Sequence, residues 1–139
     1  VEFPLLRINT RHIRRFNSPA ELRLMSQKYL DQGAFKQGAF FIDATGARYS
    51  LESVKRVRRS LNPARWFRTS PAIVVDVEVG PAQALSLGEI KEIVSNLVVG
   101  NRWYRQGNQS EPEFVKMISN AQSAADVIGA ISYYGEWLG

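Results

Sequence analysis

The chain has 139 residues, of which 45% are hydrophobic and 22% are charged, a balance that is typical of a globular domain and excludes a disordered chain. It contains no cysteine, which excludes disulfides, a cysteine-ligated zinc site and a thiol nucleophile. The net charge of +5 hides an asymmetry that bears on partners rather than on fold: residues 1–71 hold 14 Lys and Arg against 5 Asp and Glu, and residues 72–139 hold 4 against 8.

The first elements along the chain are a predicted strand and a predicted helix. The apolar residues between Leu5 and Phe16 predict extended structure. Ser18 and Glu21 then form a Ser-x-x-Glu capping box, with Pro19 at the first helical position. Behind this cap, apolar residues recur at helical spacing and a glycine follows them: Leu22, Met25, Tyr29, Leu30 and Gly33. The sequence therefore predicts one helix between Pro19 and Gly33.

A β-hairpin is predicted next. The apolar run 39–42 is followed by the turn 43–46, which ends in glycine, and by the alternating segment 48–51. The continuation is ambiguous, because the apolar residues between Leu51 and Leu61 are spaced as in a helix, whereas valine-rich sequence after a hairpin favours a bent strand. We favour the strand, with a bulge near Glu52 and Ser53.

The second half of the chain contains one predicted strand and a run of helices. Residues 72–79 form the clearest strand, with Asp76 and Glu78 on a solvated face. Three serines that each precede an acidic residue by three positions predict helix starts, at Ser86, Ser110 and Ser123. The resulting order β-α-β-β-β-α-α-α predicts an α+β fold, with an antiparallel sheet of about four strands and helices packed on one face. We expect a single domain over residues 1–139.

The sequence also indicates a compartment. No apolar run approaches the ~20 residues that cross a membrane. The start at Val1 lacks the basic-then-apolar pattern of a signal peptide, and the absence of cysteine is typical of a reducing environment. We therefore expect a cytoplasmic protein with no membrane partner.

No segment carries a convincing catalytic constellation. His12 lies among arginines, with no carboxylate placed to orient it, which favours a surface position over a role as general base. Asp76 with Glu89 and Lys91 superficially resembles a metal-dependent nuclease motif, but Glu89 is expected to cap a helix. Phosphate-binding glycine loops, a serine nucleophile elbow and histidine pairs do not occur. We expect no enzyme activity, no cofactor and no metal.

The feature that most resembles a binding site is the basic segment between Lys55 and Arg68. Its candidate contact residues are Arg56, Arg58, Arg59, Arg65, Trp66 and Arg68. Arginine beside aromatic residues binds single-stranded nucleic acid in some proteins and anchors protein–protein interfaces in others. A third interpretation is a solvated face, with Trp66 and Phe67 covering the edge of the core. We favour a protein partner, because the acidic second half of the chain would repel a phosphate backbone.

Several turn, cap and aromatic features together resemble a known family. They are Phe41-Ile42-Asp43 with Gly46 and Tyr49, Asn101-Arg102-Trp103-Tyr104, Ser110-Glu111-Pro112-Glu113-Phe114 and Tyr133-Tyr134-Gly135-Glu136-Trp137. This layout resembles the small immunity proteins encoded beside bacterial contact-dependent inhibition toxins and related polymorphic toxins. The resemblance implies a cytoplasmic protein that binds its cognate toxin domain, covers or distorts the active site of the toxin, and performs no reaction itself.

Two surfaces are candidates for that contact. Immunity proteins against nucleic-acid-cleaving toxins are often acidic, whereas this chain is basic overall. Either the basic segment contacts an acidic toxin surface, or an acidic face makes the contact instead, with Asp76, Glu78, Glu89 and Glu92. The alternative function is a small basic regulator that binds RNA or DNA through residues 55–68.

Overall fold

The computed structural model describes residues 1–9, 12–33, 38–59, 72–99 and 109–132. The strands in these ranges are β1 (Leu5–Ile8), β2 (Ile13–Phe16), β3 (Leu24–Ser26), β4 (Phe40–Ile42), β5 (Ala47–Arg59), β6 (Ala72–Val79) and β7 (Gln83–Ala84). The helices are α1 (Pro19–Leu22), α2 (Gln27–Gln32), α3 (Leu87–Val98), α4 (Glu111–Asn120) and α5 (Ala124–Gly129). None of the helices in these ranges is both long enough and apolar enough to cross a membrane.

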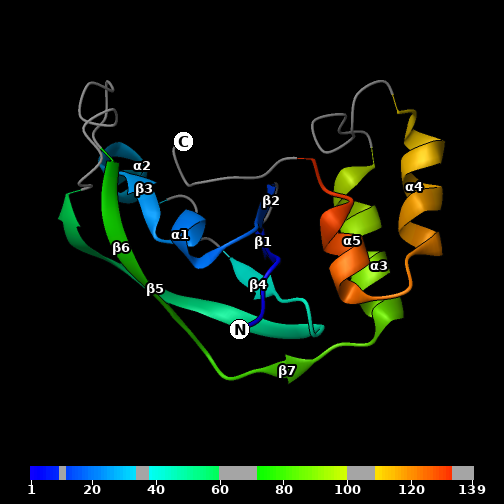
Figure 1. The fold of residues 1–139 in the computed structure, drawn as a ribbon, viewed down its shortest axis with the longest axis horizontal. Coiled ribbons are helices and arrows are strands. Elements are labelled where there is room, and N and C mark those ends of the chain that lie inside the picture. Colours follow the sequence, from blue (N-terminus) through cyan, green and yellow to red (C-terminus); the bar gives the residue numbers. More distant parts are fainter. Residues whose placement is uncertain (10–11, 34–37, 60–71, 100–108, 133–139) are drawn as a thin grey trace.

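The strands form one antiparallel sheet that curls. Its order is β2-β1-β4-β5-β6-β3, and β7 pairs with the start of β5. The 13-residue strand β5 connects both halves of the sheet, because it pairs with β4 over residues 48–50 and with β6 from Leu51 to Arg59. Its register with β6 shifts between Leu51 and Ser53 and again between Arg56 and Arg58, and bulges of this kind bend a strand. Figure 1 shows β5 passing below β4 and rising alongside β6.

The sheet buries apolar side chains on both faces, because successive side chains of a strand point in opposite directions. On one face, Leu6, Ile8 and Ile42 pack with residues of α3, α4 and α5, and we refer to this cluster as the helix-covered core. On the other face the sheet curls over itself and forms the curled-sheet core. That core contains Leu5, Phe16, Met25, Phe41, Val54, Ile73 and Val75. Figure 1 shows α3, α4 and α5 on one side of β1 and β4, and β3, β6 and α2 on the other.

The α+β class and the antiparallel sheet are confirmed, but the finer arrangement is wrong. The sheet has more than the expected four strands, and the elements begin β-β-α-β-α rather than β-α-β. The helices do not lie on one face, because Leu22 of α1 and Tyr29 and Leu30 of α2 pack against the curled-sheet core. Both faces of the sheet carry buried apolar residues, so both require cover.

The predicted continuous helix between Pro19 and Gly33 is also wrong. Ser18 caps a first helical turn as expected. The chain then becomes extended, and β3 pairs with the edge of β6 so that Met25 lies opposite Ile73. Ser26 caps a second short helix, α2. Pairing with β6 buries Met25 completely, and this tertiary contact overrides a helical spacing that is only a weak local preference.

The other predicted elements are confirmed. The β4–β5 hairpin turns through Gly46, whose φ of 87° lies in the left-handed region that favours glycine. β5 continues as the expected bent strand, and the expected strand over residues 72–79 is β6. Each of the last three helices begins at the expected serine, whose hydroxyl accepts a hydrogen bond from the backbone N–H three residues further on, at Ser86, Ser110 and Ser123.

Candidate functional site

Four basic side chains lie on the second half of β5, and two acidic side chains lie beside them on β6. We refer to this surface as the charged ribbon, and its residues are Lys55, Arg56, Arg58, Arg59, Asp76 and Glu78. Each of these residues is exposed. Lys55 lies directly opposite Asp76 in the register of the two strands. The basic segment therefore shares one surface with part of the proposed acidic face.

The basic residues of β5 point to two different sides of the sheet. Arg56 lies opposite Val75, which belongs to the curled-sheet core, and its Nη1 donates a 2.8 Å hydrogen bond to Gln27 Oε1 on α2. Lys55 precedes Arg56 directly in the strand and therefore points to the opposite side, since successive side chains of a strand alternate. The other two cations also differ in side, since Arg58 lies opposite Val74 and Arg59 lies opposite Ile73 of the curled-sheet core. A partner that contacts all four cations must therefore wrap around this part of β5.

The charged ribbon contains ion pairs that leave most of its charge available. Lys55 Nζ lies 3.8 Å from Glu78 Oε1, and Asp76 Oδ1 lies 3.5 Å from Nη2 of Arg23, which follows α1. All four side chains are more than half exposed. Exposed pairs at such distances contribute between 0 and about 1 kcal/mol to stability, so the two pairs are not what holds β5 to β6.

The remaining candidate contact residues are not brought into this surface. Glu89 and Glu92 lie on α3, which covers the opposite face of the sheet. Glu89 is part of a complete capping box, because its carboxylate accepts a 3.1 Å hydrogen bond from the backbone N–H of Ser86. The four acidic candidates thus do not form one face. Arg65, Trp66 and Arg68 lie outside the described residues.

The residues considered for catalysis do not converge. His12 is exposed, and its backbone N–H donates a 2.8 Å hydrogen bond to Asn9 Oδ1 in the turn between β1 and β2. Lys91 Nζ donates a 2.7 Å hydrogen bond to the Ser119 carbonyl of α4, away from Asp76 on β6. Within the described part of the chain, no group of three or more His, Asp or Glu side chains is arranged to hold a metal ion.

Part of the positive charge of the first half is buried rather than available for binding. Arg7 on β1 and Arg14 on β2 lie opposite each other, and their exposed fractions are 2% and 8%. Arg7 Nη1 donates a 3.2 Å hydrogen bond to the Tyr29 hydroxyl of α2. Arg7 thus links the sheet to α2, and because both arginines are buried, the exposed basic surface is narrower than the composition of residues 1–71 indicates.

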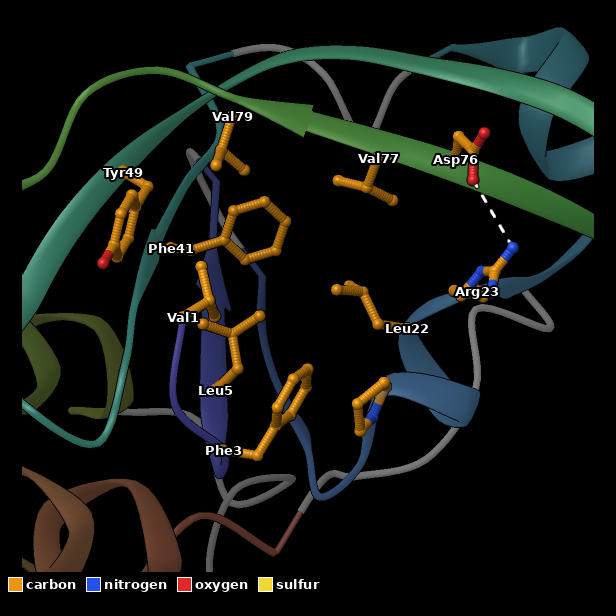
Figure 2. Close-up of a pocket in the computed structure, with 11 residues that line it drawn as sticks. Val1, Phe3, Leu5, Leu22, Arg23, Phe41, Tyr49, Asp76, Val77 and Val79 are labelled. Atoms are coloured by element: carbon orange, nitrogen blue, oxygen red, sulfur yellow. Dashed lines mark ion pairs between the residues drawn. The ribbon is translucent and has the colours of Figure 1, made fainter.

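A pocket of about 220 Å³ opens on the same side of the sheet as the curled-sheet core. Figure 2 shows its apolar wall, to which the sheet, α1 and the chain before β1 contribute Phe3, Leu5, Leu22, Phe41, Val77 and Val79. Arg23 and Asp76 form the charged part of its lining. This pocket is not evident from the sequence, because its wall combines short segments that are far apart in the chain. Only the alternation along β6 is a local signal for it.

Asp43 stabilises the turn between β4 and β5, which leads to Tyr49 in the lining of the pocket. Asp43 is 1% exposed, and its carboxylate accepts hydrogen bonds from the backbone N–H groups of Glu2, Thr45 and Ala47 and from the Tyr49 hydroxyl. Burial raises the pKa of Asp43, but the hydrogen bonds from Thr45, Glu2 and Ala47 together outweigh burial, so the pKa lies below its ordinary value. Burial, followed by the nearby Asp43 charge, raises the pKa of Tyr49. The turn is therefore built around an ionised carboxylate.

Comparison with protein-family models, with curated proteins and with solved structures finds no match to this chain. The function therefore has to be inferred from the charged ribbon and the pocket themselves.

Proposed function

We propose that this chain is an immunity protein: a cytoplasmic protein that binds a cognate toxin domain by direct contact through the charged ribbon and performs no reaction of its own. The observation that carries the proposal is the mixture of charge on that surface, where Asp76 and Glu78 lie beside the cations of β5. A nucleic-acid backbone is uniformly negative and is repelled by these carboxylates. A protein surface of mixed sign complements both charges and gains specificity from them.

The edge of β5 also favours a protein partner. β4 pairs with β5 only up to the hydrogen bond between Leu51 N and the Ala39 carbonyl. Among the described residues, β5 beyond Leu51 therefore has a strand partner on one edge only, which is β6. An exposed strand edge offers backbone donors and acceptors that an extended segment of another protein can pair with.

The proposal expects a toxin gene next to the gene of this chain, and the test uses the C-terminal domain of that toxin. Cells that express the toxin domain should stop growing, and co-expression of this chain should restore growth. When the two purified proteins are mixed, isothermal titration calorimetry should detect a complex between them. The double variant Arg58→Ser, Arg59→Ser should weaken the complex about 100-fold or more, because arginines at the centre of an interface contribute a large share of the affinity. Its melting temperature should stay within a few degrees of the parent.

The matched control removes the same number of charges elsewhere. Lys91→Ser with Lys116→Ser neutralises two cations on α3 and α4, on the helix-covered side, and should leave the affinity within about threefold. Equal losses in both double variants would mean that net charge alone drives the contact. A toxin domain whose toxicity is unaffected by this chain would overturn the proposal. Steeply salt-dependent retention on a polyanion column, abolished by the Arg58 and Arg59 substitutions, would support the nucleic-acid-binding regulator instead.

A further inference from the structure

The pocket has the size of a single aromatic ring system. An engineered, fully apolar cavity of about 150 Å³ binds benzene, and this pocket is larger, at about 220 Å³. It opens where the sheet curls, a position comparable to the mouth of a β-barrel, where small-molecule sites often lie. Figure 2 shows Leu22 and Val77 projecting toward each other across it. A two-ring group of the size of indole therefore matches the available volume.

The wall of the pocket favours an aromatic occupant. Phe3, Phe41 and Tyr49 contribute three rings to the lining. The Tyr49 hydroxyl is engaged by Asp43 at 3.3 Å, so its ring rather than its polar end is available to the pocket. Aromatic rings prefer edge-to-face or offset contacts with other rings, and such contacts add specificity to the burial of apolar area.

The charged part of the lining adds a second requirement. Arg23 Nη2 and Asp76 Oδ1 lie 3.5 Å apart, and their side chains are 55% and 63% exposed. The two opposite charges thus lie next to an apolar cavity and remain accessible to solvent. A ligand that carries a carboxylate and an ammonium close together matches this pair with opposite charges, the carboxylate toward Arg23 and the ammonium toward Asp76.

We propose that this pocket binds a small zwitterionic aromatic molecule, chemically an aromatic α-amino acid, with its ring between Leu22 and Val77 and its charged groups at Arg23 and Asp76. This proposed ligand binding does not depend on the proposed immunity function. Binding is measured on the protein alone, so failure to neutralise a toxin leaves it untouched, and failure to bind the amino acid leaves the charged ribbon untouched.

The experiment is a titration of the isotope-labelled chain with L-tryptophan, followed by amide chemical shifts in NMR. Shifts should concentrate at Leu22, Arg23 and Val77 and saturate with a Kd on the order of 1 mM or tighter, as expected for a ligand of this size. Indole, which lacks both charges, and N-acetyl-L-tryptophanamide, which presents the ring as a side chain of a protein does, should each bind at least about fivefold more weakly. Binding of the capped compound as tightly as tryptophan would overturn the proposal in favour of a partner side chain.

Two substitutions with matched controls locate the site. Val77→Phe fills the pocket and should abolish binding, whereas Val115→Phe makes the same change at a half-buried valine of α4 and should leave the Kd within twofold. Arg23→Gln should weaken tryptophan binding about tenfold without affecting indole, and Lys116→Gln should affect neither. A Val77→Phe variant that is folded by its amide spectrum and still binds tryptophan would overturn the proposal. So would the absence of saturable shifts at 10-fold the expected Kd.

Discussion

The two faces of strands β1 and β4 are covered in different ways. On the helix-covered side, apolar residues of α3, α4 and α5 pack against the sheet, and Phe114, Ile118 and Ile128 are completely buried. On the curled-sheet side, the cover consists of β3, β6 and two short helices, and a pocket of about 220 Å³ remains. Of the ribbon cations, Arg56 lies on this second side, where it donates a hydrogen bond to Gln27 of α2. The helix-covered face is thus closed by packed helices, whereas the curled-sheet face keeps an opening beside its own buried residues.

The largest effect is expected from truncating a side chain of the helix-covered core, and the same kind of change beside the pocket should cost much less. Ile118→Ala removes a side chain with 0% exposure from the helix-covered core and should lower the free energy of unfolding by about 4 kcal/mol. Leu22→Ala changes a half-buried residue in the wall of the pocket and should cost about 1 kcal/mol, because part of its surface already faces open space. Urea unfolding measures both. Equal costs would mean that the curled-sheet side is packed as tightly as the helix-covered side.

A medium effect is expected from the turn beside the pocket. Asp43→Asn should cost about 2 kcal/mol at pH 7, because the charged acceptor of several hydrogen bonds is lost and an amide donor faces backbone N–H groups. The folded-state pKa of Asp43 lies below its ordinary value, so its contribution is present above the unfolded pKa of about 4 and disappears as the pH falls through the folded pKa.

The measurement is the difference in urea unfolding free energy between the parent and Asp43→Asn at a series of pH values from 7 to 2.5. The difference should be constant above about pH 5 and should shrink below about pH 4. The control is Asp31→Asn, which changes an exposed carboxylate of α2 and should alter the free energy of unfolding at pH 7 by less than about 0.5 kcal/mol. A difference that stays constant down to pH 2.5 would show that Asp43 acts through shape and not through charge.

The smallest effect is expected at the charged ribbon. Glu78→Gln removes the exposed 3.8 Å ion pair with Lys55 and should change the free energy of unfolding by less than about 0.5 kcal/mol. Glutamine keeps an oxygen that can accept the 2.9 Å hydrogen bond from the Ser53 hydroxyl. A loss above about 1 kcal/mol would mean that the ribbon holds β5 to β6, and that its charges serve the fold rather than a partner.

The sequence predicted the elements whose signals are local. The serine caps at Ser86, Ser110 and Ser123 satisfy backbone donors within one helical turn, so the start of each helix can be inferred without knowing its neighbours. The β4–β5 turn was similarly predictable, since its glycine adopts a left-handed conformation. The exposure of Asp76 and Glu78 was predictable because they lie two residues apart in β6 and therefore on the same face of the strand.

Only the tertiary structure decided which partners these elements have. The spacing of Leu22, Met25 and Tyr29 is typical of a helix. In the structure, however, Met25 pairs with the edge of β6 as part of β3, and this strand divides the predicted helix into α1 and α2. The charged ribbon and the pocket depend on the same long-range pairing, since the curl of β5 brings β6 and α1 together around the pocket. By itself, the sequence determined the class of the fold, the starts of its helices and the excess of positive charge in residues 1–71. Long-range strand pairing decided which of these positive charges are buried, which are exposed and which residues lie beside them. The reason is that strand pairing joins segments that are far apart in the chain, and the local sequence of one segment does not indicate its partner.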